Sequence, residues 1–225
     1  NEYKTNFDNA QTAQEQIDLI KSYNSHMDLV DSMSQLVMIR YSIDTTDKFY
    51  EAEQEFLDEK GPMLSEYSVE FEKSILNSKF RNELEKEFGI LLFQQLEIST
   101  KIFNPSIINL LQEENKLNSE YMKLKGSAKI LFDGKEYTLS SMSPFTTGKD
   151  RTVRKNATLA VSKWFKDNEN SFDEIYDKVV KVRHEIALKL GYENFIQLGY
   201  DRMQRVDYNH YDVKKYREQI LADRR

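Results

Sequence analysis

Residues that interrupt helices are scarce along this chain, whose 225 residues include only seven glycines and three prolines. So few breakers favour long uninterrupted elements, and helices above all. Over most of the length, apolar residues recur every three or four positions, which is the period of a helix with one buried face. The sequence therefore predicts a mostly α protein, built as an antiparallel helical array.

The period changes between residues 127 and 140, where the apolar residues alternate as they do in a half-buried strand. Asp133–Gly134, at the centre of this segment, is a preferred two-residue hairpin turn, and it would pair Ile130 with Tyr137. We therefore expect one β-hairpin, with Asp133 and Gly134 as structural residues. Because an isolated hairpin is marginally stable in water, it should pack on the helices.

The clearest helix boundaries lie around residues 104–126. Asn104 can cap a helix, Pro105 suits its first turn, and Gly126 is placed to end it. An earlier helix, which passes through Phe49, contains Gly61–Pro62, and we expect these two residues to interrupt it.

A polar segment from Ser140 to Gly148 is the best candidate for a domain boundary. It predicts a helical N-terminal domain at 1–143, which includes the hairpin, and a second domain at 144–225. The chain ends inside a helical pattern without a stop signal, and we interpret the second domain as truncated.

The helix predicted over 171–190 carries a well-defined apolar stripe. Ser171 can serve as its N-cap, Glu174 completes a capping box, and Gly191 supplies a left-handed stop. Arg183 falls inside the stripe, so its guanidinium needs a carboxylate or carbonyl partner. We expect Arg183 and Gly191 to be structural; the alternative for Arg183 is a contact to substrate or to a further domain.

The segment that follows is rich in aromatic and basic side chains. Tyr200, Arg202 and Arg205 are candidate substrate-binding residues, because rings and guanidinium groups can line a peptide groove. The competing interpretation is that they anchor one helix to another, which is a common role of Tyr and Arg.

His184–Glu185 begins like a zinc helix, which requires two histidines four residues apart with a glutamate between them. The residue four positions after His184 is Leu188, and His26 and His210 are isolated. The chain has no cysteine, which excludes disulfides and cysteine-ligated metal. We therefore expect this chain to contain no metal ligand and no catalytic residue.

Charge and hydropathy narrow the possible partners and the compartment. The net charge of −6 argues against a nucleic-acid partner, and we interpret the basic cluster at 149–155 as a solvated face. No apolar run approaches the roughly 18 to 20 residues that span a membrane, so no membrane partner is expected. The absence of cysteine suits a reducing cytoplasm.

Four segments of the chain, in colinear order, resemble the oligoendopeptidase F family of zinc metallopeptidases, which is related to thimet oligopeptidase. They are IRYSIDTTDKFYEAE at 39–53, ILFDGKEYTLSSM at 130–142, DRTVRKNA at 150–157, and KVRHEIALKLGYENFIQLGYDRMQRVDY at 181–208. The resemblance covers most of the chain. It implies a cytoplasmic bacterial enzyme that cleaves short peptides in a helical channel.

The resemblance also implies which part of such an enzyme this chain is. The family's His-Glu-x-x-His zinc helix lies downstream of the last matching segment, so zinc would belong to the intact enzyme. Residues 144–225 would be the first helices of its catalytic domain, and the remainder of that domain would be a partner of this chain. The chain would form one wall of the channel and be inactive alone. The alternative is a non-enzymatic helical module that binds peptides or proteins.

Overall fold

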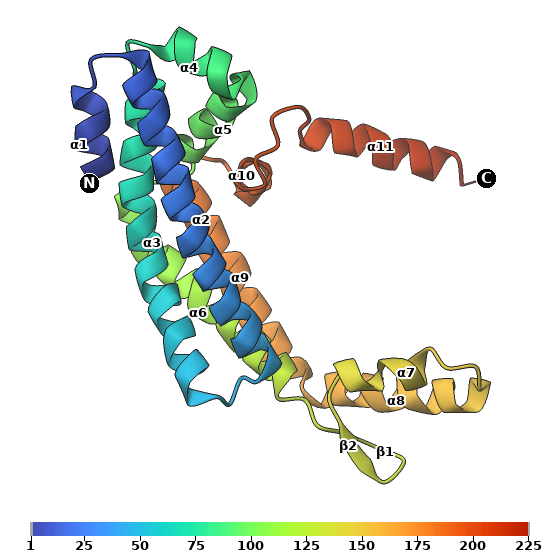
Figure 1. Ribbon diagram of the computed structural model, residues 1–225. Helices are drawn as coiled ribbons and strands as arrows, with labels where there is room; N and C mark the ends of the chain where they lie inside the picture. Colours follow the sequence, from blue (N-terminus) through green and yellow to red (C-terminus); the bar gives the residue numbers. More distant parts are fainter. Residues whose placement is uncertain (1, 225) are drawn as a thin grey trace. The chain divides into compact units, whose positions relative to one another are not determined.

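The computed structural model of the protein describes residues 2–224 (Figure 1). It is mostly helical and contains one two-stranded antiparallel hairpin, which confirms the predicted fold class. The longer helices are α1 (Glu2–Asn9), α2 (Ala13–Ile43), α3 (Lys48–Leu76), α4 (Arg81–Phe88), α5 (Ile90–Lys101), α6 (Ile108–Gly126), α8 (Arg151–Asp167), α9 (Glu169–Lys189), α10 (Phe195–Arg202) and α11 (His210–Ala222). The short elements are the 3-10 turns η1 (Pro105–Ile107) and η2 (Ser140–Met142), helix α7 (Ser143–Thr146), and strands β1 (Ile130–Phe132) and β2 (Lys135–Tyr137).

The chain forms two compact units, and each is built from segments that are far apart in the sequence. Unit 1 contains residues 2–32, 60–112 and 183–224, and unit 2 contains residues 33–59 and 113–182. These units follow from contacts within the chain, and the expected domain boundary between residues 143 and 144 stays a prediction.

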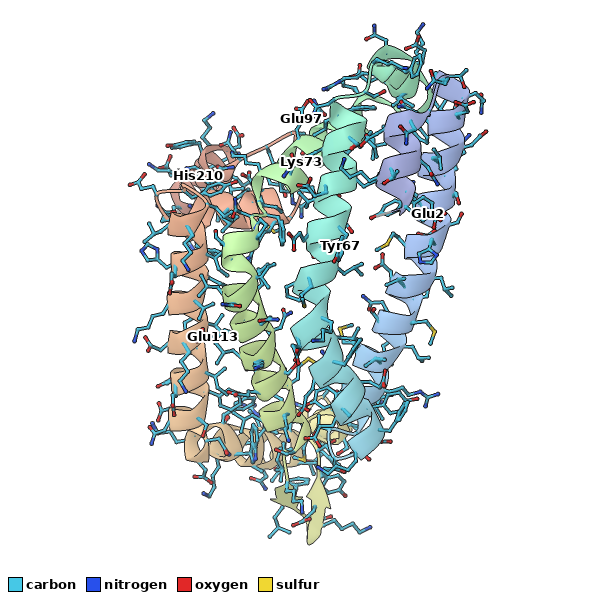
Figure 2. The ribbon with its side chains drawn as sticks, turned by 90° about the vertical axis from the view of Figure 1, so that its left-hand side faces the viewer. Glu2, Tyr67, Lys73, Glu97, Glu113 and His210 are labelled. Atoms are coloured by element: carbon cyan, nitrogen blue, oxygen red, sulfur yellow. The ribbon has the colours of Figure 1, made fainter. Side chains whose placement is uncertain are left out.

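The core of unit 1 is an apolar cluster to which α1, α2, α3, α4 and α5 all contribute. Its buried members are Phe7, Ile17, Ile20, Phe71, Ile75, Leu84, Phe93 and Leu96. The Phe71 ring packs edge-on against Phe7, with ring centroids 5.4 Å apart, and lies 4.5 Å from the Tyr23 ring. Burial of such aromatic side chains supplies most of the stabilisation of a small core. Charged side chains such as Lys73 and Glu97 lie on the outside (Figure 2).

The hairpin belongs to unit 2 and has the predicted register, in which Ile130 pairs with Tyr137. Asp133 and Gly134 have φ angles of 50° and 75°, the left-handed backbone that a tight two-residue hairpin turn requires. Ile130 joins Met142 and Ala157 of α8 in a small buried cluster. The hairpin is therefore supported by helix packing, as expected.

The predicted start signals act on η1, which leads directly into α6, and α6 ends at Gly126 as its last residue. The Asn104 side chain accepts a hydrogen bond from the Ser106 N–H at 2.9 Å, and Pro105 occupies the first turn. At the other end, a Cβ on Gly126 would lie only 2.9 Å from Cγ2 of Thr45, which is buried. Gly126 therefore permits the close approach of the α2–α3 connection.

Helix α3 is continuous through Gly61 and Pro62, so the expected interruption is wrong. A proline removes the N–H that would bond to the carbonyl four residues earlier, which here is the carbonyl of Asp58. Asn115 Nδ2 of α6 donates to that carbonyl oxygen at 3.2 Å and replaces the missing helical donor. The proline is tolerated because a neighbouring helix satisfies the backbone group that it leaves unpaired.

Helix α9 begins at Glu169, and the expected N-cap at Ser171 is wrong. The Asn168 carbonyl accepts hydrogen bonds from the N–H groups of Ser171 and Phe172, so Asn168 ends α8 and starts α9 without a linker. At the other end Gly191 has a φ angle of +82°, and the Tyr192 N–H reaches back to the Ala187 carbonyl at 2.9 Å. This pairing is the usual stop for a helix that ends at glycine.

Candidate functional site

The aromatic and basic segment that follows α9 folds largely onto itself within unit 1. The Phe195 ring at the start of α10 lies beneath two guanidinium groups, those of Arg183 and Arg202, each 5.5 Å from the ring centroid. Such stacking holds a half-buried arginine through attraction between its charge and the ring. The structure thus brings Arg183, predicted to be structural, and Arg202, predicted to bind substrate, to one ring.

The other two candidate substrate-binding residues meet at a different ring. The Arg205 guanidinium lies 5.3 Å from the centroid of Tyr208, and the Tyr200 ring packs edge-on against Tyr208 at 6.2 Å. Arg205 is exposed and Tyr200 is half-buried, so both have surface that a ligand could reach. Their role in substrate binding stays a prediction.

Sequence reasoning missed the carboxylate at the centre of this segment. Asp201 is 5% exposed, and it accepts hydrogen bonds from the Tyr192 hydroxyl at 2.5 Å and from Gln197 Nε2 at 2.7 Å. Burial, together with the bond to Asp201, raises the pKa of Tyr192 well above its usual range. Lys101 Nζ of α5 lies 3.5 Å from Asp201 Oδ2 and supplies a nearby positive charge.

This network extends to the start of α11, where Gln197 Oε1 lies 3.2 Å from His210 Nδ1. Asn209 caps α11 in a capping box with Asp212, and His210 is the first residue of that helix. The available sequence signal was the spacing of Gln197 and Asp201, which are one helical turn apart. We interpret the network as a connection between α5, α10 and α11.

The histidines of the described chain do not fit a zinc site. His184 is exposed on α9, Glu185 pairs with Lys189 at 3.5 Å, and Leu188 occupies the place of a second histidine. Among residues 2–224, no group of three or more His, Cys, Asp or Glu side chains is arranged to hold a metal ion. No helix in the same range is long and apolar enough to cross a membrane.

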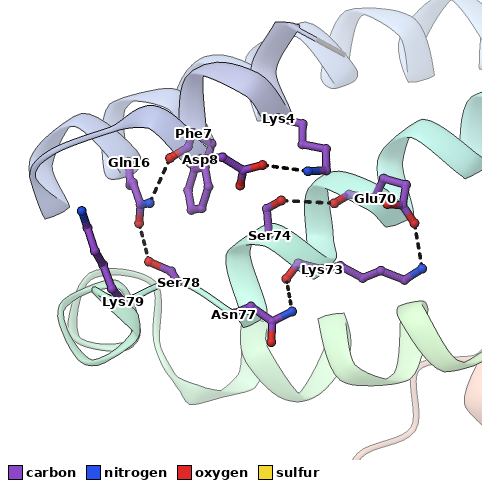
Figure 3. Close-up of a pocket in the computed structure, with 10 residues that line it drawn as sticks. All are labelled: Lys4, Phe7, Asp8, Gln16, Glu70, Lys73, Ser74, Asn77, Ser78 and Lys79. Atoms are coloured by element: carbon purple, nitrogen blue, oxygen red, sulfur yellow. Dashed lines mark hydrogen bonds and ion pairs between the residues drawn. The ribbon is translucent and has the colours of Figure 1, made fainter.

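A polar groove of about 420 Å³ lies between α1, α2, α3 and the turn that follows α3 (Figure 3). Its ten lining residues are Lys4, Phe7, Asp8, Gln16, Glu70, Lys73, Ser74, Asn77, Ser78 and Lys79. Lys4 pairs with Asp8 at 2.7 Å, and Lys73 pairs with Glu70 at 2.8 Å. These four charges neutralise each other, and the lysine ammonium of Lys79 is the one further charge in the lining.

The amides and hydroxyls of this polar groove are also largely engaged with one another. Gln16 Nε2 donates to the Phe7 carbonyl at 3.1 Å, and the Ser78 hydroxyl donates to Gln16 Oε1. Asn77 Nδ2 donates to the carbonyl of Lys73 at 2.8 Å. Internal satisfaction of this kind is typical of a structural surface.

A second groove, of about 210 Å³, is more apolar and lies beside the first one, between α1, α2 and α3. Tyr3, Tyr23, Met27 and Tyr67 contribute to its lining, and Tyr67 is 54% exposed (Figure 2). Tyr23 is oriented by a hydrogen bond of 2.9 Å to the Ser68 hydroxyl. Exposed aromatic side chains of this kind can contact apolar groups of a ligand.

Comparison with known proteins shows which protein class the N-terminal part of the chain resembles. Residues 1–103 match the peptidase M3 N-terminal domain. No match was found among curated proteins. The chain thus carries the N-terminal domain of an M3 family peptidase.

Three solved structures are similar to this chain and specify the kind of M3 peptidase that it resembles. The chain is 42% identical to one protein described as oligoendopeptidase F, 44% identical to an oligoendopeptidase F from Bacillus anthracis str. Ames, and 43% identical to PZ peptidase A with an inhibitor. The TM-scores are 0.93, 0.92 and 0.92. The matches cover 97–98% of this chain but only 39–40% of those chains. The predicted resemblance to the oligoendopeptidase F family is confirmed.

Proposed function

We propose that this chain is the N-terminal part of a zinc-dependent oligopeptidase that hydrolyses short peptides, and that it forms one wall of the substrate channel. The observation that carries this proposal is the identity of 42–44% to oligoendopeptidase F and PZ peptidase structures over nearly the whole chain. Identity at this level across a helical domain supports a shared role of that domain.

In this proposal the zinc ion and the residues that activate water lie in the rest of the protein. The described residues offer no metal-binding group, and the buried carboxylates of Asp58 and Asp201 are held in structural networks. The chain contributes shape, exclusion of folded proteins, and contacts to the peptide. The remainder of its catalytic domain is then its partner, and we propose the cytoplasm as its location because the chain has no cysteine.

The decisive experiment compares this 225-residue chain with the complete product of its gene. We expect the complete product to contain about one zinc ion and to cleave a quenched fluorescent peptide until a chelator removes the metal. The isolated chain should not cleave the peptide. A folded protein offered as substrate should be cleaved neither by the isolated chain nor by the complete product. A complete product that binds peptides but never cleaves them, with or without zinc, would contradict the proposal and support the non-enzymatic binding module.

The proposed peptide contacts of this segment have a separate test in the complete enzyme. Arg205→Ala should raise the KM for a short peptide and leave kcat nearly unchanged, because an exposed guanidinium that contacts substrate supplies uniform binding. Arg217→Ala removes an equally exposed arginine on α11 and is the matched control. Equal kinetics in both variants would show that Arg205 serves only to pack against Tyr208.

A further inference from the structure

A third cavity of unit 1, of about 230 Å³, contains a buried carboxyl group that none of the preceding features uses. Its lining comes from α2, α3, α5 and the turn after α10, and consists of Ile20, Tyr23, Asn24, Phe71, Glu72, Ile75, Leu92, Gln95, Leu96, Ser99 and Gln204. A water molecule occupies about 30 Å³ in the liquid, so a ligand of several heavy atoms fits. The exposed Gln204 gives the cavity a side that solvent can reach.

Glu72 is the only acidic residue in this lining. Its Oε2 is buried and has no hydrogen-bond partner within the described chain. Burial raises the pKa of the Glu72 carboxyl, and a hydrogen bond with Ser99 opposes that rise only in part. A buried carboxyl oxygen without a partner is costly, and native proteins retain few of them. No group of the described chain donates to this oxygen.

The lining contains no lysine, arginine or histidine that could supply this donor. It does contain the rings of Tyr23 and Phe71, whose centroids are 4.5 Å apart with planes tilted by 53°. Aromatic faces next to a carboxylate are the surroundings in which proteins hold organic cations. The amides of Asn24, Gln95 and Gln204 add acceptors for further N–H groups.

We propose that this cavity binds a primary organic ammonium group, with Glu72 as its counter-ion. The ammonium donates to the unpartnered Oε2, and its alkyl stem contacts the apolar lining formed by Ile20, Ile75 and Leu96. Three sources share this chemistry: a small alkylamine, a lysine side chain, and the amino terminus of a peptide. The inference does not depend on the proposed peptidase function, since it concerns a cavity within unit 1 alone.

The test is a calorimetric titration of the purified protein with n-butylamine, with n-butanol as the uncharged analogue. An alkylamine has a pKa near that of lysine, about 10.4, and stays charged from pH 5 to 8. Because only ionised Glu72 binds it, the affinity should rise about tenfold per pH unit below the Glu72 pKa and then level off. Binding below that pKa should release a proton. Tyr23, the other titratable group of the lining, stays neutral because burial raises its pKa.

The variant Glu72→Gln should abolish saturable binding of n-butylamine. It should fold, since the glutamine side chain has nearly the same shape as that of glutamate. Glu70→Gln, at an exposed position two residues earlier on α3, is the matched control and should bind as the wild type does. A second readout uses the wild type only: at a pH below the Glu72 pKa, the infrared carbonyl band of the protonated carboxyl should disappear when the amine binds.

Three results would each overturn the proposal: no saturable binding of any amine, equal binding of n-butanol, or unchanged binding in Glu72→Gln. If the amine binds, diglycine and Nα-acetyl-lysine amide distinguish the sources. Tighter binding of diglycine assigns the cavity to a peptide amino terminus, and tighter binding of the lysine derivative assigns it to a side chain.

Discussion

Asn115 Nδ2 lies 3.2 Å from the backbone carbonyl oxygen of Asp58, which is the carbonyl that Pro62 deprives of its helical donor. The Asp58 side chain is buried as well, and it accepts from the Ser119 hydroxyl at 2.5 Å and from Gln54 Nε2 at 2.9 Å. Helix α6 therefore donates hydrogen bonds to both the backbone and the side chain of Asp58, through Asn115 and Ser119. This arrangement explains how α3 continues through a proline.

Removing that donor should destabilise the fold. In Asn115→Ala the Asp58 carbonyl loses its partner in a buried setting, and we expect a loss of about 1–3 kcal/mol in the free energy of unfolding. Pro62→Ala restores the helical N–H, so the cost of Asn115→Ala should be smaller in that background. Denaturant unfolding of the wild type, the two single variants and the double variant measures the cost of Asn115→Ala in both backgrounds. Strictly additive effects would show that Asn115 does not replace the missing donor.

The Tyr192 hydroxyl should contribute to stability through Asp201. Tyr192→Phe removes a hydrogen bond to a buried carboxylate, and bonds to charged groups contribute about 1.5–3 kcal/mol. We expect a loss of that size in chemical denaturation. Because the pKa of Tyr192 is raised, alkaline spectrophotometric titration of the wild type should include a tyrosine that ionises only when the protein unfolds. That tyrosine should be missing from the titration of Tyr192→Phe.

The ion pairs of Glu51 should make stability depend on pH at the acid end. Hydrogen bonds from Lys123 and Lys48 lower the pKa of Glu51 from 4.5 to about 2. Since the folded state holds this proton less tightly than the unfolded state, the contribution is complete above the ordinary value of 4.5. It disappears as the pH falls to about 2.

Glu51→Gln should therefore have a lower melting temperature than the wild type at pH 7, and the difference should close by about pH 2. Glu53→Gln, two residues away on the same helix, is a suitable control at matched ionic strength. A difference in melting temperature that persisted unchanged at the lowest pH would contradict the ion-pair explanation. At that pH Glu51 becomes protonated and is then as uncharged as the glutamine that replaces it.

Arg183 and Arg202 should contribute to stability through the ring that they share. A guanidinium over a ring contributes about 0.5–1 kcal/mol at exposed sites, and we expect at least this loss for Arg183→Ala. With Phe195→Leu as the background, the loss should shrink because the ring is already absent. Arg217→Ala, on an exposed face of α11, should change the free energy of unfolding little. An unchanged stability of Arg183→Ala with weaker peptide binding would favour a substrate contact.

The features that the sequence predicted correctly depend on neighbours along the chain. The two residues of the Asp133–Gly134 turn adopt positive φ angles, and this local geometry sets the pairing of Ile130 with Tyr137. Asn104 and Gly191 act within one turn of the helices that they bound. Such signals need no knowledge of the rest of the molecule, and so one sequence was sufficient to find them.

Features that depend on contacts between residues far apart in the sequence could be found only in the tertiary structure. Pro62 predicts a break because its local effect is to break a helix, but the compensating donor of Asn115 comes from another helix. Asp201 meets Lys101 across 100 residues of chain, and the cavity of Glu72 needs three helices and a turn to enclose it. Periodicity specifies which face of a helix is buried, but which polar groups meet on that face depends on packing in three dimensions.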